Sequence, residues 1–175
     1  LWITPSEGST FIGTLNDWSI VEEELITTAI VAKFSADSAD PVHVYWEHSF
    51  PFDFTDYTKL VEESYFAMTW ASDRDGNVFL AARNPEEFTI TGYDPQGEAY
   101  IEISRDFPMV EKTPEEMEVE GEFWNERARN MGAQIEVDFQ PNPYRWQVHS
   151  MGIHREGRLW VRRGTEEMPT FDVFQ

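Results

Sequence analysis

One phrase of sequence occurs twice in this chain, and this repetition limits the possible folds more than any other feature. Residues 73–97 read DRDGNVFLAARNPEEFTITGYDPQG, and a looser copy, HREGRLWVRRGTEEMPTFDVFQ, spans 154–175. When Gly76 is aligned with Gly157, an offset of 81 residues, the strand-like segments on both sides of the following loop coincide. Because one offset aligns two strands and the loop between them, we expect the chain to be built from repeated structural units.

A third copy lies upstream, with a different spacing. Its segment STFIGTL, residues 9–15, aligns with NVFLAAR, residues 77–83. Both units then end in Phe-Pro, at 50–51 and at 107–108. Strands that persist while their loops change length are expected, because connections on the surface tolerate insertions.

Each unit has the pattern of four short strands. In the middle unit, runs rich in aromatic and β-branched residues alternate with turn signals, at about 66–72, 77–83, 87–93 and 98–104. Asp-Gly at 75–76 favours a tight hairpin between the first two runs. Four antiparallel strands in a repeated unit are typical of a β-propeller blade. We therefore expect blade-like units at about 1–51, 66–108 and 144–175.

The phrases DRDGNVFLAA, FTITGYDPQGE and HREGRLWVRRGTEEMPTFDVF resemble the bacterial six-bladed β-propellers of the NHL-like type. The resemblance implies an all-β fold of four-stranded antiparallel blades. It also implies that residues 1–175 form a single partial domain, about half of a six-bladed propeller, with one helical insertion. Gln175 departs from the family pattern, which usually has Asp at that position. Propellers host binding proteins, scaffolds, hydrolases and lyases, so the resemblance bears on the fold and leaves the function open.

Three blades would form an open half-ring with uncovered apolar faces, at a cost of about 25 cal/mol per Å². The chain begins with Leu1 rather than Met, and its last unit stops at Gln175, where the aligned copy continues into a turn. We therefore expect a fragment of a longer chain. The missing blades of that chain, or other subunits of a complex, would cover the open faces.

Two segments interrupt the strand pattern. The first, 52–64, has the composition of a short helix, and the second predicts a helix over 113–131. Thr113 is placed as its N-cap, Pro114 as its first residue, and Glu116 completes a capping box. Acidic residues fill the first turns and arginines the last, which complements the helix dipole.

One stripe of this helix is apolar and consists of Met117, Trp124, Ala128 and Met131. The stripe has two interpretations. It packs on the propeller itself, or the helix projects and docks a protein partner through Met117, Trp124 and Met131.

The chain is strongly acidic, with 33 acidic against 13 basic residues and a net charge of −20. This balance argues against nucleic acid as a partner, because phosphate contacts need clustered lysine and arginine. Acidic groups recur in the loops between the second and third strands of the units, and we expect them on one rim. They are Glu22, Glu23, Glu24, Glu86, Glu87, Glu166 and Glu167. Such a rim is either simply solvated or binds a cation or a basic protein surface.

Signals for catalysis are weak. The chain has no cysteine, and no nucleophile or phosphate-binding motif is present, so we expect no catalytic residues and no cofactor. His149 is the one weak metal candidate, because an innermost strand would turn it toward the central channel. The alternative is a structural histidine.

Together these features predict a non-enzymatic protein-binding or scaffold module, a peripheral or accessory subunit of a larger assembly. One alternative is a metal-dependent propeller hydrolase or lyase, and a second is a carbohydrate-binding propeller that uses its strand tryptophans. No run approaches the roughly 20 apolar residues of a transmembrane helix. We expect a periplasmic or extracytoplasmic location, where association with the periphery of a membrane complex remains open.

Overall fold

The computed structural model describes residues 3–5, 9–38, 40–53, 56–65, 68–130, 137, 139–164 and 169–175. Strands make up 50% of the structure and helices 16%, and the sheets are antiparallel, without a closed barrel. The expectation of an all-β fold is therefore confirmed.

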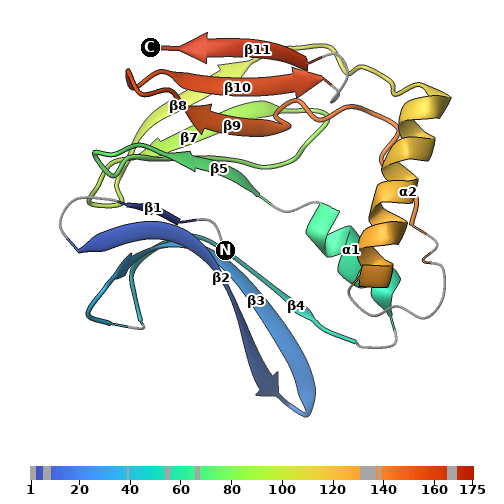
Figure 1. Ribbon diagram of the computed structural model, residues 1–175, viewed down its shortest axis with the longest axis horizontal. Coiled ribbons are helices and arrows are strands. Elements are labelled where there is room, and N and C mark those ends of the chain that lie inside the picture. The colour runs from blue at the N-terminus through green and yellow to red at the C-terminus, as the bar shows by residue number, and fades with distance from the viewer. Residues whose placement is uncertain are drawn as a thin grey trace.

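The strands form three meanders (Figure 1). The first sheet consists of β1 (Ile3–Pro5), β2 (Thr10–Val21), β3 (Glu24–Ser35) and β4 (Pro41–Pro51). The second consists of β5 (Thr69–Ser72), β6 (Val78–Ala81), β7 (Phe88–Tyr93) and β8 (Ala99–Arg105). The third contains β9 (Ser150–Ile153), β10 (Leu159–Gly164) and β11 (Pro169–Phe174). Strands adjacent in sequence are also adjacent in each sheet, so hairpins rather than crossovers connect them.

Three of the hairpins turn at a glycine with positive φ: Gly76 at 91°, Gly97 at 90° and Gly157 at 80°. In each turn the glycine N–H donates to the carbonyl of the residue three positions earlier. Residues with a Cβ rarely adopt such a φ, which is why glycine is found there. The aligned glycines Gly76 and Gly157 thus occupy the same place in the same kind of turn.

The β2–β3 hairpin is longer and turns differently. Val21 pairs with Glu24, so only two residues form the turn. These are Glu22 and Glu23, with φ of 50° and 72°. Positive φ at both central residues matches the twist of the flanking strands, although Asn-Gly is the usual sequence for such a turn.

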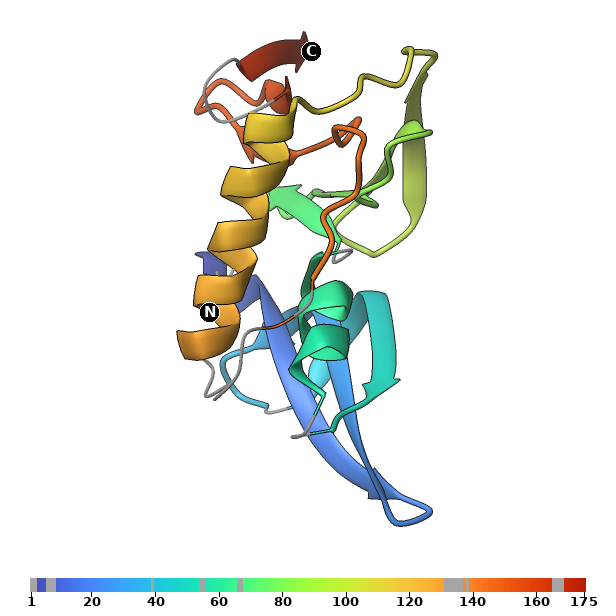
Figure 2. The same ribbon diagram turned by 90° about the vertical axis from the view of Figure 1, so that its right-hand side faces the viewer.

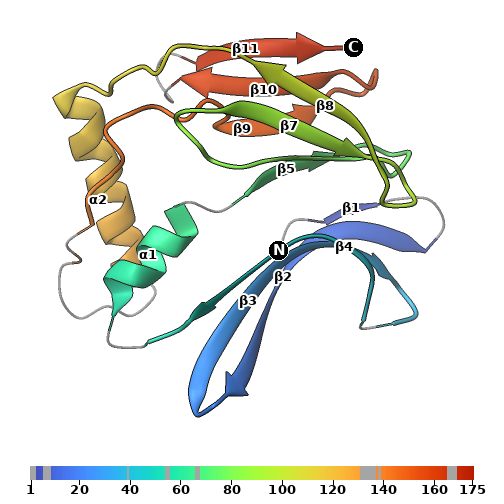
Figure 3. The ribbon, with the colours of Figure 1, turned by 180° about the vertical axis from the view of Figure 1, so that it is seen from behind.

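The second sheet lies between the other two (Figures 1 and 3). Because side chains alternate along a strand, β6 buries both of its faces. Val78 and Leu80 belong to a cluster with Ile12 and Val31 of the first sheet. The opposite face, with Ala81, belongs to a cluster with β7 and with Leu159 and Val161 of the third sheet. Burial on both sides makes the second sheet the centre of the core, and β5 contacts β9 directly.

The outward face of the third sheet is apolar and exposed. On β10, Leu159 and Val161 are buried, so Trp160 between them points away from the second sheet. Phe171 and Val173 of β11 lie opposite Arg162 and Trp160, on the same outward face. The exposed fractions are 39% for Trp160, 50% for Phe171 and 44% for Val173.

Two helices pack at one side of the sheets, α1 (Tyr57–Tyr65) and α2 (Pro114–Asn130) (Figure 2). The predicted capping box is confirmed. The N–H of Thr113 donates to Oε2 of Glu116 at 2.7 Å, and the N–H of Glu116 donates to Oγ1 of Thr113 at 3.3 Å. Among the described residues, no helix combines the length and the apolar character needed to cross a membrane.

A separate core joins the helices. Trp124 and Ala128 of α2 cluster with Val61 of α1 and with Val137, Phe139 and Trp146 of the segment that leads to β9. These six side chains are at most 8% exposed. The helices are therefore fixed to the chain that connects the second and third sheets.

Candidate functional site

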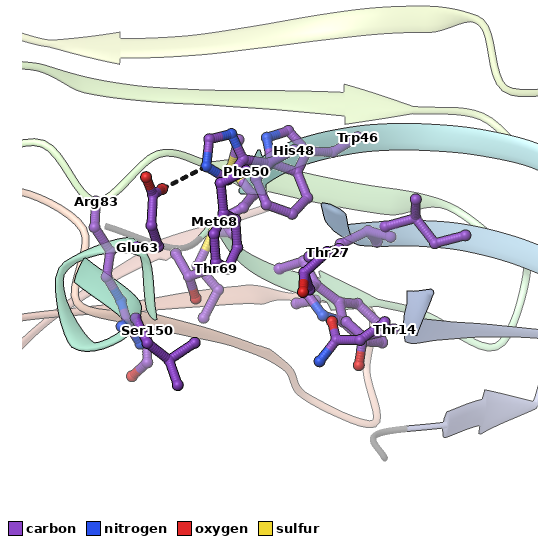
Figure 4. Close-up of a pocket in the computed structure, with 18 of the residues that line it drawn as sticks. Thr14, Thr27, Trp46, His48, Phe50, Glu63, Met68, Thr69, Arg83 and Ser150 are labelled. Carbon is purple, nitrogen blue, oxygen red and sulfur yellow. Dashed lines mark hydrogen bonds and ion pairs between the residues drawn. The ribbon is translucent and has the colours of Figure 1, made fainter. Parts of the chain in front are cut away.

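A cleft of about 1080 Å³ separates the first sheet from the helices. Residues from β2, β3 and β4 line one side, and residues from α1, β5 and β9 line the other (Figure 4). Residues of α2 complete this second side. The cleft forms because the first sheet meets the second near one end of its strands, in the cluster around Ile12 and Val31. The other end of the long β2–β3 hairpin diverges from the second sheet (Figure 1).

The floor of the cleft is one face of the first sheet. Strand pairing arranges nine side chains in three rows across β2, β3 and β4. The rows are Trp18–Thr27–Phe50, Asn16–Ala29–His48 and Thr14–Val31–Trp46. The central strand carries the smallest side chain in two of the three rows, at Thr27 and Ala29, so this part of the floor is a trough with larger side chains along its borders.

One border is a column of rings on β4. The centroids of Trp46 and His48 lie 5.9 Å apart with planes at 24°, and those of His48 and Phe50 lie 5.7 Å apart with planes at 30°. Alternation along the strand puts the three rings on one face. Because each ring stacks on its neighbour, the column presents ring edges rather than open ring faces to the cleft.

His48 also connects the floor to α1. Its Nε2 lies 2.6 Å from Oε2 of Glu63, with 44% and 27% of the two side chains exposed (Figure 4). Glu63 and Leu60, one helical turn apart, both line the cleft. The carboxylate of Glu63 therefore already has a partner, the His48 ring.

On the α2 side of the cleft, the guanidinium of Arg127 lies over the ring of Trp124. Phe123, Trp124 and Arg127 line the cleft, and the guanidinium of Arg127 lies 5.5 Å from the centroid of the Trp124 ring. No carboxylate among the described residues pairs with Arg127. Arg83 is the second arginine of the lining. Among the described lining residues, two arginines thus accompany one carboxylate, that of Glu63, although the chain as a whole has a net charge of −20.

Two buried hydroxyls of the lining have no hydrogen-bond partner in the part of the chain that the structure describes. They are Oγ1 of Thr27, a residue that is 6% exposed, and Oγ of Ser72. An unpaired buried hydroxyl costs about 1–3 kcal/mol. Such groups are commonly explained by a ligand or a water molecule that completes the site.

The acidic residues expected on one rim are placed at separate turns. Glu22 and Glu23 form the tip of the β2–β3 hairpin, and Glu24 begins β3. Glu86 and Glu87 precede β7. Figures 1 and 2 show the hairpin tip projecting away from the second and third sheets, so the first group lies apart from the second. Glu166 and Glu167 lie outside the described residues.

The predicted helical stripe packs within the chain over its described part. Trp124 is 8% exposed and belongs to the helical core, and Met117 is half-buried. Met131 lies outside the described residues. The stripe therefore packs within the chain, although against α1 and the segment that leads to β9 rather than against a face of the predicted propeller blades. Phe123, next to Trp124, is 56% exposed and borders the cleft instead.

His149 interacts with Arg162. The backbone N–H of His149 donates to the backbone carbonyl of Arg162 at 2.9 Å, and Nη2 of Arg162 lies 2.7 Å from Nδ1 of the His149 ring. Because arginine has only donors, Nδ1 is the acceptor. No group of three or more histidine, aspartate or glutamate side chains gathers to hold a metal within the described part of the chain.

Sequence reasoning missed the cleft, although one signal was present. In VYWEHSF, residues 44–50, aromatic side chains recur at every second position, as Trp46, His48 and Phe50. On a strand this spacing predicts a ring column on one face. Comparisons with protein-family models, curated proteins and solved structures give no match, so the interpretation of the cleft rests on its own geometry.

Proposed function

We propose that this chain is a non-enzymatic scaffold module made of β-propeller blades, whose outward sheet faces are covered by protein in a larger assembly. The observation that carries the proposal is the outward face of the third sheet. Its three large apolar side chains, Trp160, Phe171 and Val173, are between 39% and 50% exposed.

The arrangement of the sheets supports the propeller part of the proposal. The three sheets are meanders, they stack face to face, and β5 contacts β9 at the junction of the second and third sheets. Repeated meanders with neighbouring first strands are features of propeller blades. The shared turn geometry at Gly76 and Gly157 supports an origin of these sheets in one repeated unit.

The middle sheet indicates which kind of occupant fits the outward face. There, both faces are covered by sheets of the same kind, and Val78, Phe88 and Ile90 are at most 1% exposed. A sheet with an apolar face is stable only when another layer covers that face. A further blade, from the same ring or from another subunit, would cover Trp160 and Phe171 in the way that the third sheet covers Phe88.

The first sheet has a comparable face. Leu15 and Val44 are 42% and 38% exposed, and they lie beside the cluster of Ile30, Ala32 and Phe34. Both ends of the stack therefore carry apolar surface, which suits a module placed between neighbours. An accessory subunit that joins other proteins is the role that this arrangement favours.

The test is the association of the 175-residue chain measured by sedimentation velocity over a range of concentrations. We expect the wild-type chain to self-associate through its apolar faces, and the double variant Phe171→Thr/Val173→Thr to associate at least about tenfold more weakly. Threonine keeps a β-branched side chain on the strand, so the fold is retained. Circular dichroism checks that retention.

The matched control is Val119→Thr, which removes an apolar side chain that is 65% exposed on α2. Its association should equal that of the wild type. Equal association of all three proteins would overturn the proposal, because the outward face of the third sheet would then need no cover.

A further inference from the structure

We propose that the cleft between the first sheet and α2 is a binding site for a small planar aromatic carboxylate. This site is distinct from the outward sheet faces on which the scaffold proposal rests. Its floor is the inner face of β2, β3 and β4, and its cationic wall carries Arg127.

The size and lining of the cleft fit a small molecule. Its volume of about 1080 Å³ lies slightly above the range of about 300–1,000 Å³ that is usual for ligand pockets. More than half of its lining residues are aromatic or aliphatic, and the others include hydroxyl, amide, imidazole and charged side chains. Such a composition is typical of sites that bury a ligand's apolar body and orient it by a few polar contacts.

The ring column favours a planar ligand. Trp46, His48 and Phe50 stack on one another, so their edges face the trough. The edge of an aromatic ring carries positive partial charge and its face negative, which is why rings prefer edge-to-face or offset contacts. An aromatic ligand that lies in the trough would present its electron-rich face to these edges. The small side chains of Thr27 and Ala29 leave room for it.

The charged side chains of the lining indicate that the ligand is an anion. Glu63 is held by His48 at 2.6 Å, whereas Arg127 has no carboxylate partner among the described residues. The Arg127 guanidinium lies over the ring of Trp124, which is buried in the helical core. A planar guanidinium matches a carboxylate with two parallel hydrogen bonds. A carboxylate of the ligand would therefore pair with the guanidinium of Arg127.

The floor supplies a further polar contact. Oγ1 of Thr27 is buried without a partner in the row between Trp18 and Phe50. A hydroxyl donates as well as accepts, so a ligand oxygen that settles on the floor would satisfy it. Thr27 and Arg127 belong to opposite sides of the cleft, on β3 and α2, which suits an elongated ligand with polar groups at both ends.

The test compares two probes of equal ring size and opposite charge, 2-naphthoate and 2-naphthylmethylammonium, by isothermal titration calorimetry. We expect saturable 1:1 binding of 2-naphthoate, at least about tenfold tighter than that of the cation. Arg127→Gln should weaken 2-naphthoate at least about tenfold. Arg129→Gln is the matched control: it removes the same charge from an exposed position of the same helix outside the lining, and should leave binding unchanged.

A second variant locates the site without relying on charge. Ala29→Phe fills the trough between Asn16 and His48 and should abolish binding of 2-naphthoate, while circular dichroism checks that the sheet is retained. Three outcomes would overturn the proposal: equal binding of both probes, equal effects of Arg127→Gln and Arg129→Gln, or binding that survives Ala29→Phe. Loss of binding only in Phe171→Thr/Val173→Thr would place the probe on the outward face instead. Saturable binding of cellohexaose with no binding of 2-naphthoate would make the cleft a carbohydrate site.

Discussion

Arg145 and Glu116 connect the start of α2 to the segment that leads into the third sheet. Nη2 of Arg145 donates to Oε2 of Glu116 at 2.9 Å, and the same oxygen accepts the N–H of Thr113 at 2.7 Å. The two side chains are 23% and 21% exposed. One carboxylate therefore caps the helix and ties it to a residue 29 positions later in the chain.

The first prediction concerns the charge of Glu116. Burial alone would raise its pKa, but the hydrogen bonds from Arg145 and from the Thr113 N–H, together with the positive charges of Arg145 and Lys112, outweigh burial and hold the pKa below the ordinary 4.5. A carboxyl whose pKa is depressed in the folded state stabilises the fold above its unfolded pKa, and this contribution is lost as the pH falls through the folded pKa. We expect Glu116→Gln to lower the free energy of unfolding by about 1 kcal/mol at neutral pH. The difference from the wild type should shrink as the solution becomes acidic.

Urea denaturation at several pH values measures this difference. Glu118→Gln, at an exposed position of the same helix, is the control and should change stability by less than about 0.5 kcal/mol. A loss in Glu116→Gln that stays constant down to acid pH would show that the charge of Glu116 does not cause it.

The second prediction compares two turn glycines. Gly97 and Gly157 both have positive φ, at 90° and 80°. A Cβ added at Gly97 would lie 2.5 Å from ring atoms of His43, whereas a Cβ at Gly157 would meet nothing within 4 Å. We expect Gly157→Ala to cost about 1–2 kcal/mol from backbone strain alone, and Gly97→Ala to cost more because the His43 ring must move. Thermal denaturation of both variants checks the order, and equal losses would contradict it.

The third prediction compares two strand glycines without positive φ. At Gly92 an added Cβ would lie 2.5 Å from Cγ2 of Ile101, whereas nothing lies within 4 Å at Gly152. Gly92→Ala should therefore destabilise by about 1–3 kcal/mol through overpacking. Gly152→Ala should be neutral or stabilise by up to about 1 kcal/mol, because alanine restricts the unfolded chain. Chemical denaturation of both variants measures the sign, and a destabilised Gly152→Ala would contradict the open space at this position.

The fourth prediction separates the two faces of α2. Trp124 is 8% exposed in the helical core, and the adjacent Phe123 is 56% exposed. Trp124→Ala should lower the free energy of unfolding by about 3–5 kcal/mol, as expected for a buried aromatic side chain. Phe123→Ala should change it by less than about 0.5 kcal/mol. A small loss in Trp124→Ala, measured by urea denaturation, would instead favour a helix that is free to dock a partner.

Local patterns in the sequence were sufficient for many of the elements. The strand expected at 87–93 is observed as Phe88–Tyr93, and the helix expected at 113–131 is observed as Pro114–Asn130. Each is set by interactions within a few residues: alternation along the strand, and the Thr113–Glu116 capping box at the helix start. Such elements can be predicted from the sequence because they do not depend on the rest of the chain.

The turn conformation of the β2–β3 hairpin does not follow from its local sequence. Its turn was expected at the acidic triplet, but Glu22-Glu23 carries no residue that favours positive φ. Instead, the turn is stabilised by the long pairing of β2 with β3, which runs from Thr10–Ser35 to Val21–Glu24. A register of this kind is enforced by many cross-strand pairs together rather than by the two residues at the tip.

The repeated strands, the glycine turns and the capped helix follow from the order of residues, because each depends on neighbours in the chain. The cleft was decided by tertiary structure alone. It needs the first sheet to diverge from the second, Glu63 of α1 to reach His48, and Trp124 to be buried so that Arg127 lies at the lining. These relationships join residues that lie up to about a hundred positions apart, and packing free energy rather than local preference brings them together.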